Sequence, residues 1–473
     1  MSCLKNSARR YQTNTNQSLD GFSGETVNMG AAHSSAEKKG DYVDSEILRE
    51  MSVPQDTLFA ILQPHIIPME TVRSRGYGPA LDIVQLLIGV QPTCDMVLEI
   101  WPPAFHSYNV IVPNCLNLPA LLLDLGTQPK TLVPLAMYVS SLAANCAYCS
   151  AHCCSFSARR GATLDLLKQI SLDGDITLLS SKERAVFDVA HALGSIPCTL
   201  SLKNIQDLEA ALSKADCEWI VAAATMFGSF NKLMDGLGIP LEPSTYAEVN
   251  EAMGKDWSPG KAGAMIPSDT GASPPPPVDN LYLKLQTIYI GLFGGLASLD
   301  AKLLSGIPTD AAAAGKFLYN KVGHSFPVLQ KLSHGRFICA LTQVITLNFN
   351  DENSAGLTMA HKILAGILFA DHIGSITLKK ELFVIAKHFG VMESLLNSVC
   401  DADYIAEDPL TFIMLKVTRA ISSAPANVTG ELLLEIRTNY SHLLTPPMIV
   451  ELVSFIAVCQ MLHRVESYYL LQA

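Results

Sequence analysis

Charged side chains are scarce in this chain of 473 residues, at 16% of the total, against about 25% in an average soluble domain. Basic residues are also outnumbered, with 33 Lys and Arg against 44 Asp and Glu, so the net charge is −11. Hydrophobic residues make up 49%, which excludes a long disordered or fibrous protein. The lack of a cationic excess argues against a nucleic-acid partner.

Targeting and membrane signals are weak. Residues 1–45 lack the apolar core of a signal peptide and are predicted to be a disordered tail. The 28 residues Thr131–Ala158 carry no Asp, Glu, Lys or Arg and are long enough to cross a bilayer. Their proline, asparagine, histidine and four cysteines favour a buried helix pair instead. We therefore expect no membrane span and a cytoplasmic location, with mitochondria as the alternative.

The cysteines show no disulfide framework. Eight of the twelve are scattered through a large, apolar chain, which is typical of reduced, buried thiols in an intracellular protein. The other four, which lie within nine residues, are Cys146, Cys149, Cys153 and Cys154. This cluster needs a separate explanation.

Strand-like alternation is almost absent, and VITLNF (344–349) is its best candidate. Apolar residues instead recur at helical spacing in ERAVFDVAHAL, IQDLEAALSKA, WIVAAATMFGSFNKLM and ELLLEIRTNYSHLL. The sequence therefore predicts an all-α fold.

A composition break divides the chain. Residues 254–280 are rich in Gly and Pro, include four consecutive prolines and are predicted to form a linker. The predicted organisation is a tail (1–45), a first helical domain (46–253), the linker (254–280) and a second helical domain (281–473).

The two predicted domains resemble two copies of one internal sequence repeat. LLIGVQPT at Leu86 matches LLSGIPTD at Leu303, and HSYNV at His106 matches HSFPV at His324. CSFSARRGATLDLL also matches FVIAKHFGVMESLL, and WIVAAATMFGSFNKLMD matches MIVELVSFIAVCQMLHR. The offset grows from 217 to 229, which predicts about ten extra residues in the second copy, within Arg336–Ser354.

The segment NCAYCSAHCC (145–154) contains the candidate catalytic residues. On a helix, Cys149 lies about 60° from both Cys146 and His152, so one stripe presents two thiols and an imidazole. Asn145 is predicted to cap the helix, which would put Cys146 in the first turn and stabilise its thiolate. His152 can take the proton of Cys149. Such a pair, with a lowered thiol pKa, can reduce a peroxide through a sulfenic acid and a disulfide, and either cysteine could attack first.

Metal-binding and purely structural roles for the cluster stay open. A zinc site usually needs a second pair of ligands, which the sequence lacks. Four small buried residues at a tight helix crossing would need no chemistry at all, and Cys153 and Cys154 individually fit that role. A thioredoxin-type domain is disfavoured because its CxxC opens a helix in a βαβ unit. No metal or cofactor is expected.

NCAYCSAHCCSFSARRGA resembles the CxxC helix of the AhpD-like alkylhydroperoxidases in the carboxymuconolactone decarboxylase superfamily. The segments that follow, including ERAVFDVAHALGSIPCTLS, WIVAAATMFGSFNKLMDGLGIPLEP and DWSPGKAG, are similar to those of the family. The resemblance covers about Leu121–Ala264. It implies an all-α fold that often forms homo-oligomers, hydroperoxide reduction, and Cys146, Cys149 and His152 as the matching site residues.

The chain departs from this family at two positions of the candidate site. A glutamate of the family's proton relay is replaced by Pro134, and the histidine follows the cysteines one residue earlier than usual. Asn231 matches a polar position of the family, where helix packing is an equally good explanation. In the second copy, an offset of 228 pairs Cys146, Cys149 and His152 with Gly374, Thr377 and Lys380, so the second domain is predicted to be degenerate. The resemblance implies two AhpD-like domains related by a pseudo-two-fold axis.

Three functions fit these observations. The first is a thiol peroxidase or dithiol oxidoreductase that acts on hydrogen peroxide or an organic hydroperoxide. It would use Cys146, Cys149 and His152 and be recycled by a thioredoxin-like or lipoyl dithiol. The second is a regulatory or binding protein similar in plan to the sestrins. The third is a cysteine-independent acid–base enzyme of the carboxymuconolactone decarboxylase type.

Overall fold

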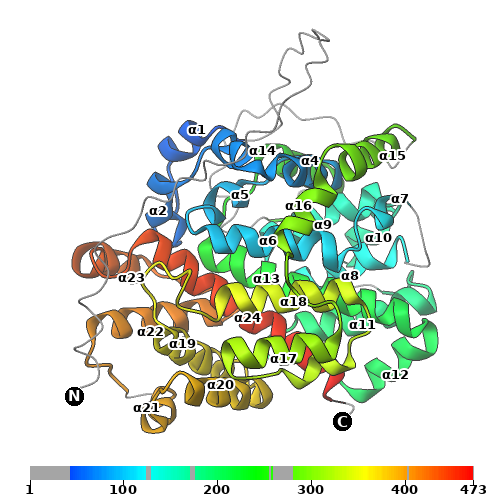
Figure 1. The fold of residues 1–473 in the computed structure, drawn as a ribbon. Helices are drawn as coiled ribbons and strands as arrows, with labels where there is room; N and C mark the ends of the chain where they lie inside the picture. The colour runs from blue at the N-terminus through cyan, green and yellow to red at the C-terminus, as the bar shows by residue number, and fades with distance from the viewer. Residues whose placement is uncertain are drawn as a thin grey trace, which may run out of the picture. The chain divides into compact units, whose positions relative to one another are not determined.

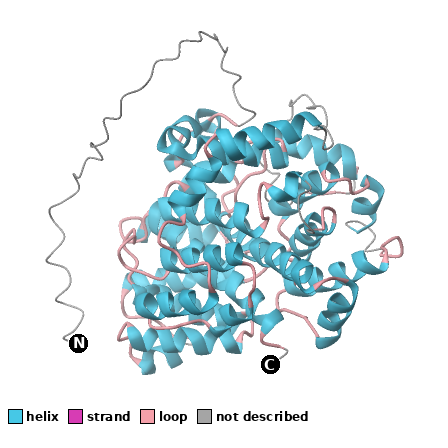
Figure 2. Cartoon of the chain, turned by 45° about the vertical axis from the view of Figure 1, so that its right-hand side comes forward, coloured by secondary structure: helices cyan, strands magenta, loops and turns pink. Residues whose placement is uncertain are grey.

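The computed structural model of the chain describes residues 43–123, 129–170, 176–254, 257–258, 281–401 and 404–471. These residues are helical or lie in loops, and none of them forms a strand (Figures 1 and 2). The predicted all-α fold class is confirmed. The described residues all belong to one compact unit, Gly40–Ala473. Most of the predicted tail and linker lie outside the described residues.

The helices fall before and after the predicted linker. Those before it are α1 (Ser45–Glu50), α2 (Phe59–Leu62), α3 (Met69–Val72), α4 (Gly78–Ile88), α5 (Thr93–Leu98), α6 (Pro102–Cys115), α7 (Ala120–Leu123), α8 (Leu132–Ala143), α9 (Ala147–Arg159), α10 (Leu164–Lys168), α11 (Ser181–Gly194), α12 (Leu202–Ala211), α13 (Lys214–Leu237) and α14 (Pro243–Met253). Those after it are α15 (Leu281–Ile288), α16 (Leu296–Leu303), α17 (Ala311–Val322), α18 (Gly335–Asn348), α19 (Met359–His372), α20 (Ile376–His388), α21 (Glu393–Ser398), α22 (Pro409–Ser422), α23 (Gly430–Glu435) and α24 (Pro446–Tyr469). Short 3-10 and π turns are η1 (Gln63–His65), η2 (Arg73–Tyr77), η5 (Tyr289–Phe293), η6 (Pro327–Lys331) and η7 (Ile436–Tyr440).

Two helices of 24 residues, α13 and α24, form the central seam of the unit. They contact each other more extensively than any other helix pair of the described residues (Figure 1). Both are apolar on nearly all sides and almost entirely buried, as expected for helices at the centre of a large protein. The two halves of the chain therefore share one core.

A close approach at Gly228 brings a buried arginine of α24 against α13. Arg464 is fully buried, and its guanidinium donates hydrogen bonds to the carbonyl oxygens of Ala224 (3.0 Å) and Gly194 (3.2 Å). A Cβ atom on Gly228 would lie 2.6 Å from Cδ of Arg464. Glycine is therefore the residue that leaves room for this side chain.

Buried polar contacts also fix the loop after α22 to α13. The Lys232 ammonium donates to the carbonyl oxygens of Ile421 (2.8 Å), Ser422 (3.2 Å) and Ser423 (2.7 Å). Two of these residues close the C-terminus of α22, where carbonyl groups lack helical partners. Asp235, one turn further along α13, accepts a 2.6 Å hydrogen bond from the backbone N–H of Ala426.

One helix of the described residues, α24, is long and apolar enough to cross a membrane by length and composition. Its most apolar window is completely buried inside the protein, packed on α13, α19 and other helices. The Thr131–Ala158 segment forms α8 and most of α9, the buried helix pair that its composition predicts.

The best strand candidate of the sequence, residues 344–349, is helical, because these residues form the end and the C-cap of α18. The central helical predictions are confirmed: ERAVFDVAHAL lies in α11 and WIVAAATMFGSFNKLM in α13. ELLLEIRTNYSHLL is helical only in its first two thirds, as α23 and η7. IQDLEAALSKA is divided between α12 and α13 at Ser213, whose side chain caps α13.

The packing order of helices recurs in the two halves, although the pseudo-two-fold itself stays a prediction. Helix α8 packs on α9, α11 and α13, and α19 packs on α20, α22 and α24. The predicted match between His106 and His324 is wrong, because His106 lies inside α6 and His324 in the loop after α17. A match of five residues is too short to establish which residues of the two halves correspond.

Candidate functional site

The two cysteines of the CxxC motif lie at the first turn of α9. The predicted cap is shifted by one residue: Cys146 is the N-cap and Asn145 precedes it. Asn145 has a φ of 53°, a left-handed conformation that asparagine tolerates better than most residues. It turns the chain between the end of α8 and the start of α9.

The thiols are in contact and buried. The Cys146 sulfur accepts a 3.4 Å hydrogen bond from the backbone N–H of Cys149, the N3 residue of the helix. Both cysteines are free, with exposed fractions of 1% and 3%. This N-cap geometry places both sulfur atoms on one side of the first turn, where a disulfide between them can form.

The predicted lowering of a thiol pKa is wrong for Cys149. Burial raises the pKa of the Cys149 thiol well above its ordinary value, and the hydrogen bond with Cys146 adds to the increase. Burial also raises the pKa of Cys153 well above its ordinary value and that of Cys154 to about 12. Cys149 is therefore protonated at rest and needs a base to become a nucleophile.

His152 and Glu242 provide such a base. The imidazole Nε2 of His152 lies 2.9 Å from Oε2 of Glu242, and both side chains are buried. No described residue forms a hydrogen bond with Nδ1 of His152. Cys149 and His152 lie one turn apart on α9 and line the same pocket. The arrangement is that of a nucleophile, a base and a carboxylate that orients the base.

Glu242 is the candidate site residue that sequence reasoning misses. It is the N-cap of α14 and is fully buried. Its carboxylate meets the histidine of α9 from a later part of the chain, whereas Pro134 occupies the position of the family's glutamate on α8. The one available signal is a glutamate directly before Pro243, since proline favours the first position of a helix and a carboxylate favours its N-terminus.

Two further groups hold the Glu242 carboxylate. Tyr148 OH donates a 2.8 Å hydrogen bond to Oε1, and the backbone N–H of Thr93 donates to the same oxygen. Burial alone would raise the pKa of Glu242, but the nearby His152 and these hydrogen bonds outweigh it, so the pKa is lowered. Glu242 is therefore ionised at neutral pH.

A second buried carboxyl group lies beside this cluster. Asp95 on α5 is fully buried, and its Oδ1 is 3.8 Å from the sulfur of Cys94. Burial raises the pKa of Asp95 well above its ordinary value, and the charge of Glu242 raises it further. The site thus holds two buried carboxyl groups whose pKa values are shifted in opposite directions, an arrangement that is common where a protein moves protons.

We expect Asp95→Asn to stabilise the protein at neutral pH. Because its pKa is higher in the folded state, Asp95 favours folding fully only below the unfolded pKa, and this contribution is lost as pH rises toward the folded pKa. Asparagine removes that loss, so the variant should exceed the wild type in free energy of unfolding at about pH 8 and approach it toward about pH 4. Urea unfolding at a series of pH values measures the difference. A difference independent of pH would contradict the prediction. Asp82→Asn, at a side chain that is 43% exposed, is the control.

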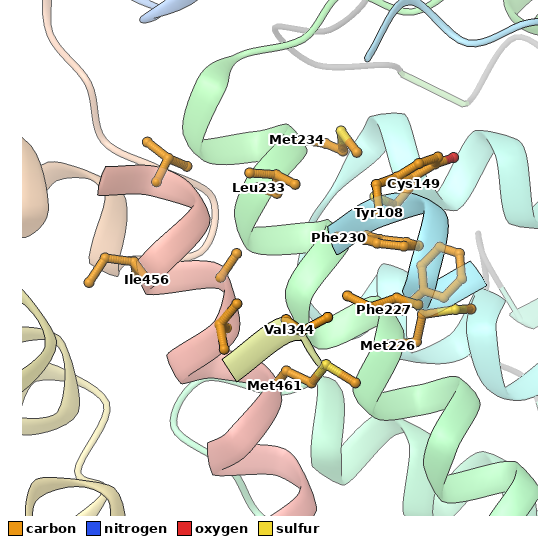
Figure 3. Close-up of a cluster of buried hydrophobic side chains, with 14 of the residues drawn as sticks. Tyr108, Cys149, Met226, Phe227, Phe230, Leu233, Met234, Val344, Ile456 and Met461 are labelled. Atoms are coloured by element: carbon orange, nitrogen blue, oxygen red, sulfur yellow. The ribbon is translucent and has the colours of Figure 1, made fainter. Parts of the chain in front are cut away.

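Cys149 and His152 line a small apolar pocket with a cavity volume of about 60 Å³, the thiol pocket. Helices α4, α5, α6, α8, α9 and α13 line it, with residues that include Leu87, Cys94, Tyr108, Met137, Phe227, Phe230 and Met234. Figure 3 shows Phe230 and Met234 of α13 on the side of Tyr108 and Cys149, and Leu233 on the side of α24. One helix therefore builds both the pocket wall and the central seam.

Cys146 lines a different and larger cavity of about 230 Å³, the Cys146 cavity. Its lining combines the start of α9 and the end of α13 with Asp56 and Thr57 from the first half of the chain and with Pro425, Ala426 and Val428 from the second. Tyr148 and Met234 line both cavities and form the partition between them.

The remaining predicted residues have structural roles. Asn231 is buried on α13 and donates a 3.3 Å hydrogen bond to the carbonyl oxygen of Ser140, which is the helix-packing role. In the second half, α20 has the same length as α9, and its N-cap Ser375 accepts from the N–H of Leu378 as Cys146 does from Cys149. When α9 and α20 are aligned at their N-cap residues, Cys146 corresponds to Ser375 rather than to the predicted Gly374.

No group of three or more His, Cys, Asp or Glu side chains in the described ranges is arranged to hold a metal ion. The zinc alternative therefore finds no support in this part of the chain.

Comparisons with known proteins give distant likenesses. No family model matches the chain, and no curated protein matches it. Two solved structures of the debrominase Bmp8 are similar to part of it. The apo form has 17% identity and a TM-score of 0.35, and the match covers 40% of this chain and 96% of that one. A form with one cysteine replaced by alanine, in complex with 2,3,4-tribromopyrrole, has 16% identity and a TM-score of 0.36, with 43% and 100% covered.

Proposed function

We propose that the protein is a thiol-dependent hydroperoxide reductase in which Cys149 attacks the peroxide and Cys146 resolves the product. The observation that carries this proposal is the Glu242–His152 pair beside Cys149, with Cys146 in contact on the other side. A buried thiol of raised pKa is inert by itself, and a base held by a carboxylate provides the missing activation.

The proposed cycle begins with transfer of the Cys149 proton to Nδ1 of His152, whose imidazolium the Glu242 carboxylate stabilises. The thiolate attacks the terminal oxygen of ROOH, the O–O bond breaks, and the alkoxide takes the proton back from His152. This step leaves ROH and a sulfenic acid on Cys149.

Cys146 then attacks the sulfenic sulfur, which forms the disulfide and releases water. An external dithiol of the thioredoxin-like or lipoyl kind returns both cysteines to the thiol form. The net reaction consumes ROOH and a dithiol and yields ROH, water and the oxidised dithiol.

The apolar lining of the thiol pocket favours an organic hydroperoxide as the substrate. Burial of a hydrocarbon group against Leu87, Phe227 and their neighbours is worth about 25 cal/mol for each Å². Hydrogen peroxide has no apolar surface to bury there. We therefore expect a lower KM for cumene hydroperoxide than for hydrogen peroxide.

Turnover of cumene hydroperoxide with dithiothreitol tests the proposal. The wild type should consume peroxide, Cys149→Ser should abolish consumption, and Cys146→Ser should allow a single oxidation without a disulfide. Mass spectrometry after one equivalent of peroxide should find the Cys146–Cys149 bond. Absence of wild-type turnover, or turnover that survives Cys149→Ser, would refute the peroxidase function.

The opposite pKa shifts of the neighbouring Asp95 and Glu242 favour one second candidate, a cysteine-independent acid–base enzyme. In that case His152 and the carboxyl groups would act directly on a substrate in the thiol pocket. The serine variants separate the two functions, because such an enzyme would keep its activity when Cys146 and Cys149 are both replaced.

A further inference from the structure

The two thiols face separate cavities although their sulfur atoms belong to one turn of helix. Cys149 and His152 line the thiol pocket, and Cys146 lines the Cys146 cavity. Tyr148 and Met234 stand between the two spaces. Tyr148 is fixed in this position because its hydroxyl donates to Glu242.

The cavities also differ in chemistry. The thiol pocket is lined mainly by aliphatic, methionine and aromatic side chains. The Cys146 cavity carries polar groups at its rim and wall, with Asp56, Thr57, Asn145 and Asp235 among its lining residues. A hydrocarbon group is favoured in the first space and a hydrated, uncharged or cationic molecule in the second.

The second half of the chain builds one wall of the Cys146 cavity. Pro425, which is exposed, and Ala426, which is half-buried, lie at its rim. The Ala426 N–H donates to Asp235, and the Ser423 carbonyl accepts from Lys232. Both anchors are on α13, the helix that also carries Met234 of the partition. The wall is thus held in a fixed place relative to Cys146.

We infer that the dithiol reductant reaches Cys146 through the Cys146 cavity, while the peroxide reaches Cys149 through the thiol pocket. The second half of the chain, which has no thiol pair of its own, thereby forms the wall of the reductant's entrance. This inference rests on the proposed function.

The chemistry of the reductive step follows from this geometry. One thiolate of the dithiol attacks the Cys146 sulfur, the Cys146–Cys149 bond breaks, and Cys149 leaves as a thiolate that is protonated. The second thiol of the reductant then attacks its own mixed disulfide, which closes the oxidised dithiol and releases Cys146. Two electrons and two protons pass to the protein. The peroxide never occupies this path.

A pair of tryptophan variants at half-buried rim positions tests the two entrances. Ala426→Trp narrows the Cys146 cavity, and Ile88→Trp, at the end of α4, narrows the thiol pocket. Each half-reaction is measured separately by stopped-flow: oxidation of the reduced protein by cumene hydroperoxide, and reduction of the diamide-oxidised protein by dithiothreitol.

Ala426→Trp should slow reduction about tenfold or more and change oxidation less than about twofold, and Ile88→Trp should do the reverse. Slowing of the same half-reaction by both variants, or unchanged reduction in Ala426→Trp, would overturn the inference. Pro425→Trp gives a second obstruction of the same wall if Ala426→Trp unfolds, as judged by circular dichroism.

Failure of the peroxidase function and failure of the separate entrance give different results. If cumene hydroperoxide does not oxidise the wild type, the proposed function fails. The entrance for the dithiol is then still tested, because diamide forms the Cys146–Cys149 disulfide without a peroxide, and dithiothreitol must still reach it.

Discussion

Replacing Glu242 by glutamine is expected to lower the rate of Cys149 oxidation by cumene hydroperoxide about 100- to 1,000-fold. In the native protein, Oε2 of Glu242 lies 2.9 Å from Nε2 of His152, and no described residue forms a hydrogen bond with Nδ1. Oε1 meanwhile accepts from Tyr148 OH and the N–H of Thr93. The two oxygens of the carboxylate thus face different groups, Oε1 its two donors and Oε2 the imidazole.

Glutamine can satisfy these groups only in one orientation. Its oxygen must take the Oε1 position, because two donors point there, so its NH₂ group faces Nε2 of His152. The imidazole then carries its proton on Nδ1 and cannot accept the proton of Cys149. We therefore expect the loss to appear in the oxidation rate rather than in the affinity for peroxide.

Single-turnover oxidation at several peroxide concentrations measures this effect. Glu248→Gln is the matched control, because Glu248 lies on α14, the helix that Glu242 caps, and its ion pair is with Arg159 at 3.4 Å, whereas His152 acts on it only as a nearby charge. Glu248→Gln should stay within about threefold of the wild type. Equal losses in both variants, or an unchanged rate in Glu242→Gln, would contradict a relay through Glu242.

Gly228→Ala is expected to destabilise the protein by about 1–3 kcal/mol, although alanine is the better helix former. The added Cβ would lie 2.6 Å from Cδ and 2.9 Å from Nε of Arg464. Arg464 cannot move aside without losing its hydrogen bonds to Ala224 and Gly194. It is fully buried, so no water replaces these partners.

A double-mutant cycle with Arg464→Met isolates the cause. Methionine is flexible and has no hydrogen bonds to keep, so Gly228→Ala should cost at least about 1 kcal/mol less in that background. Gly236→Ala, on the same helix and the same seam, should cost less than Gly228→Ala because its Cβ would approach Val453 only to 3.0 Å. Urea unfolding monitored by circular dichroism provides the free energies. Additive costs of the two substitutions would show that the clash is not with Arg464.

The sequence predicts the parts of the site that lie on one helix and misses those that come from elsewhere. The spacing of Cys146, Cys149 and His152 places them on one stripe of α9 because helical geometry is fixed by 3.6 residues per turn. Glu242 lies ninety residues after His152, and only packing of α14 against α9 brings the two together. No local pattern encodes that contact.

The raised pKa of the Cys149 thiol could not be predicted from the sequence for a similar reason. A helix N-terminus and a nearby imidazole are local features, and both favour a thiolate. Burial is a property of the whole fold, and it raises the pKa of Cys149 instead. The cap lies at Cys146 and not at Asn145, because the turn between α8 and α9 needs a left-handed residue, a role for which asparagine is better suited than cysteine.

The seam between α13 and α24 has a consequence for how the second half of the chain can change through mutation. Its helices carry single cysteines but no CxxC pair, and Arg464, Ser422 and Ala426 contact the same helix that lines both cavities. Whether a substitution in the second half is tolerated would therefore depend on how the new side chain packs against α13, and not on its chemical reactivity. Removal of the second half would leave one side of α13 exposed to water, so this half supports the fold of the first whatever its own chemistry.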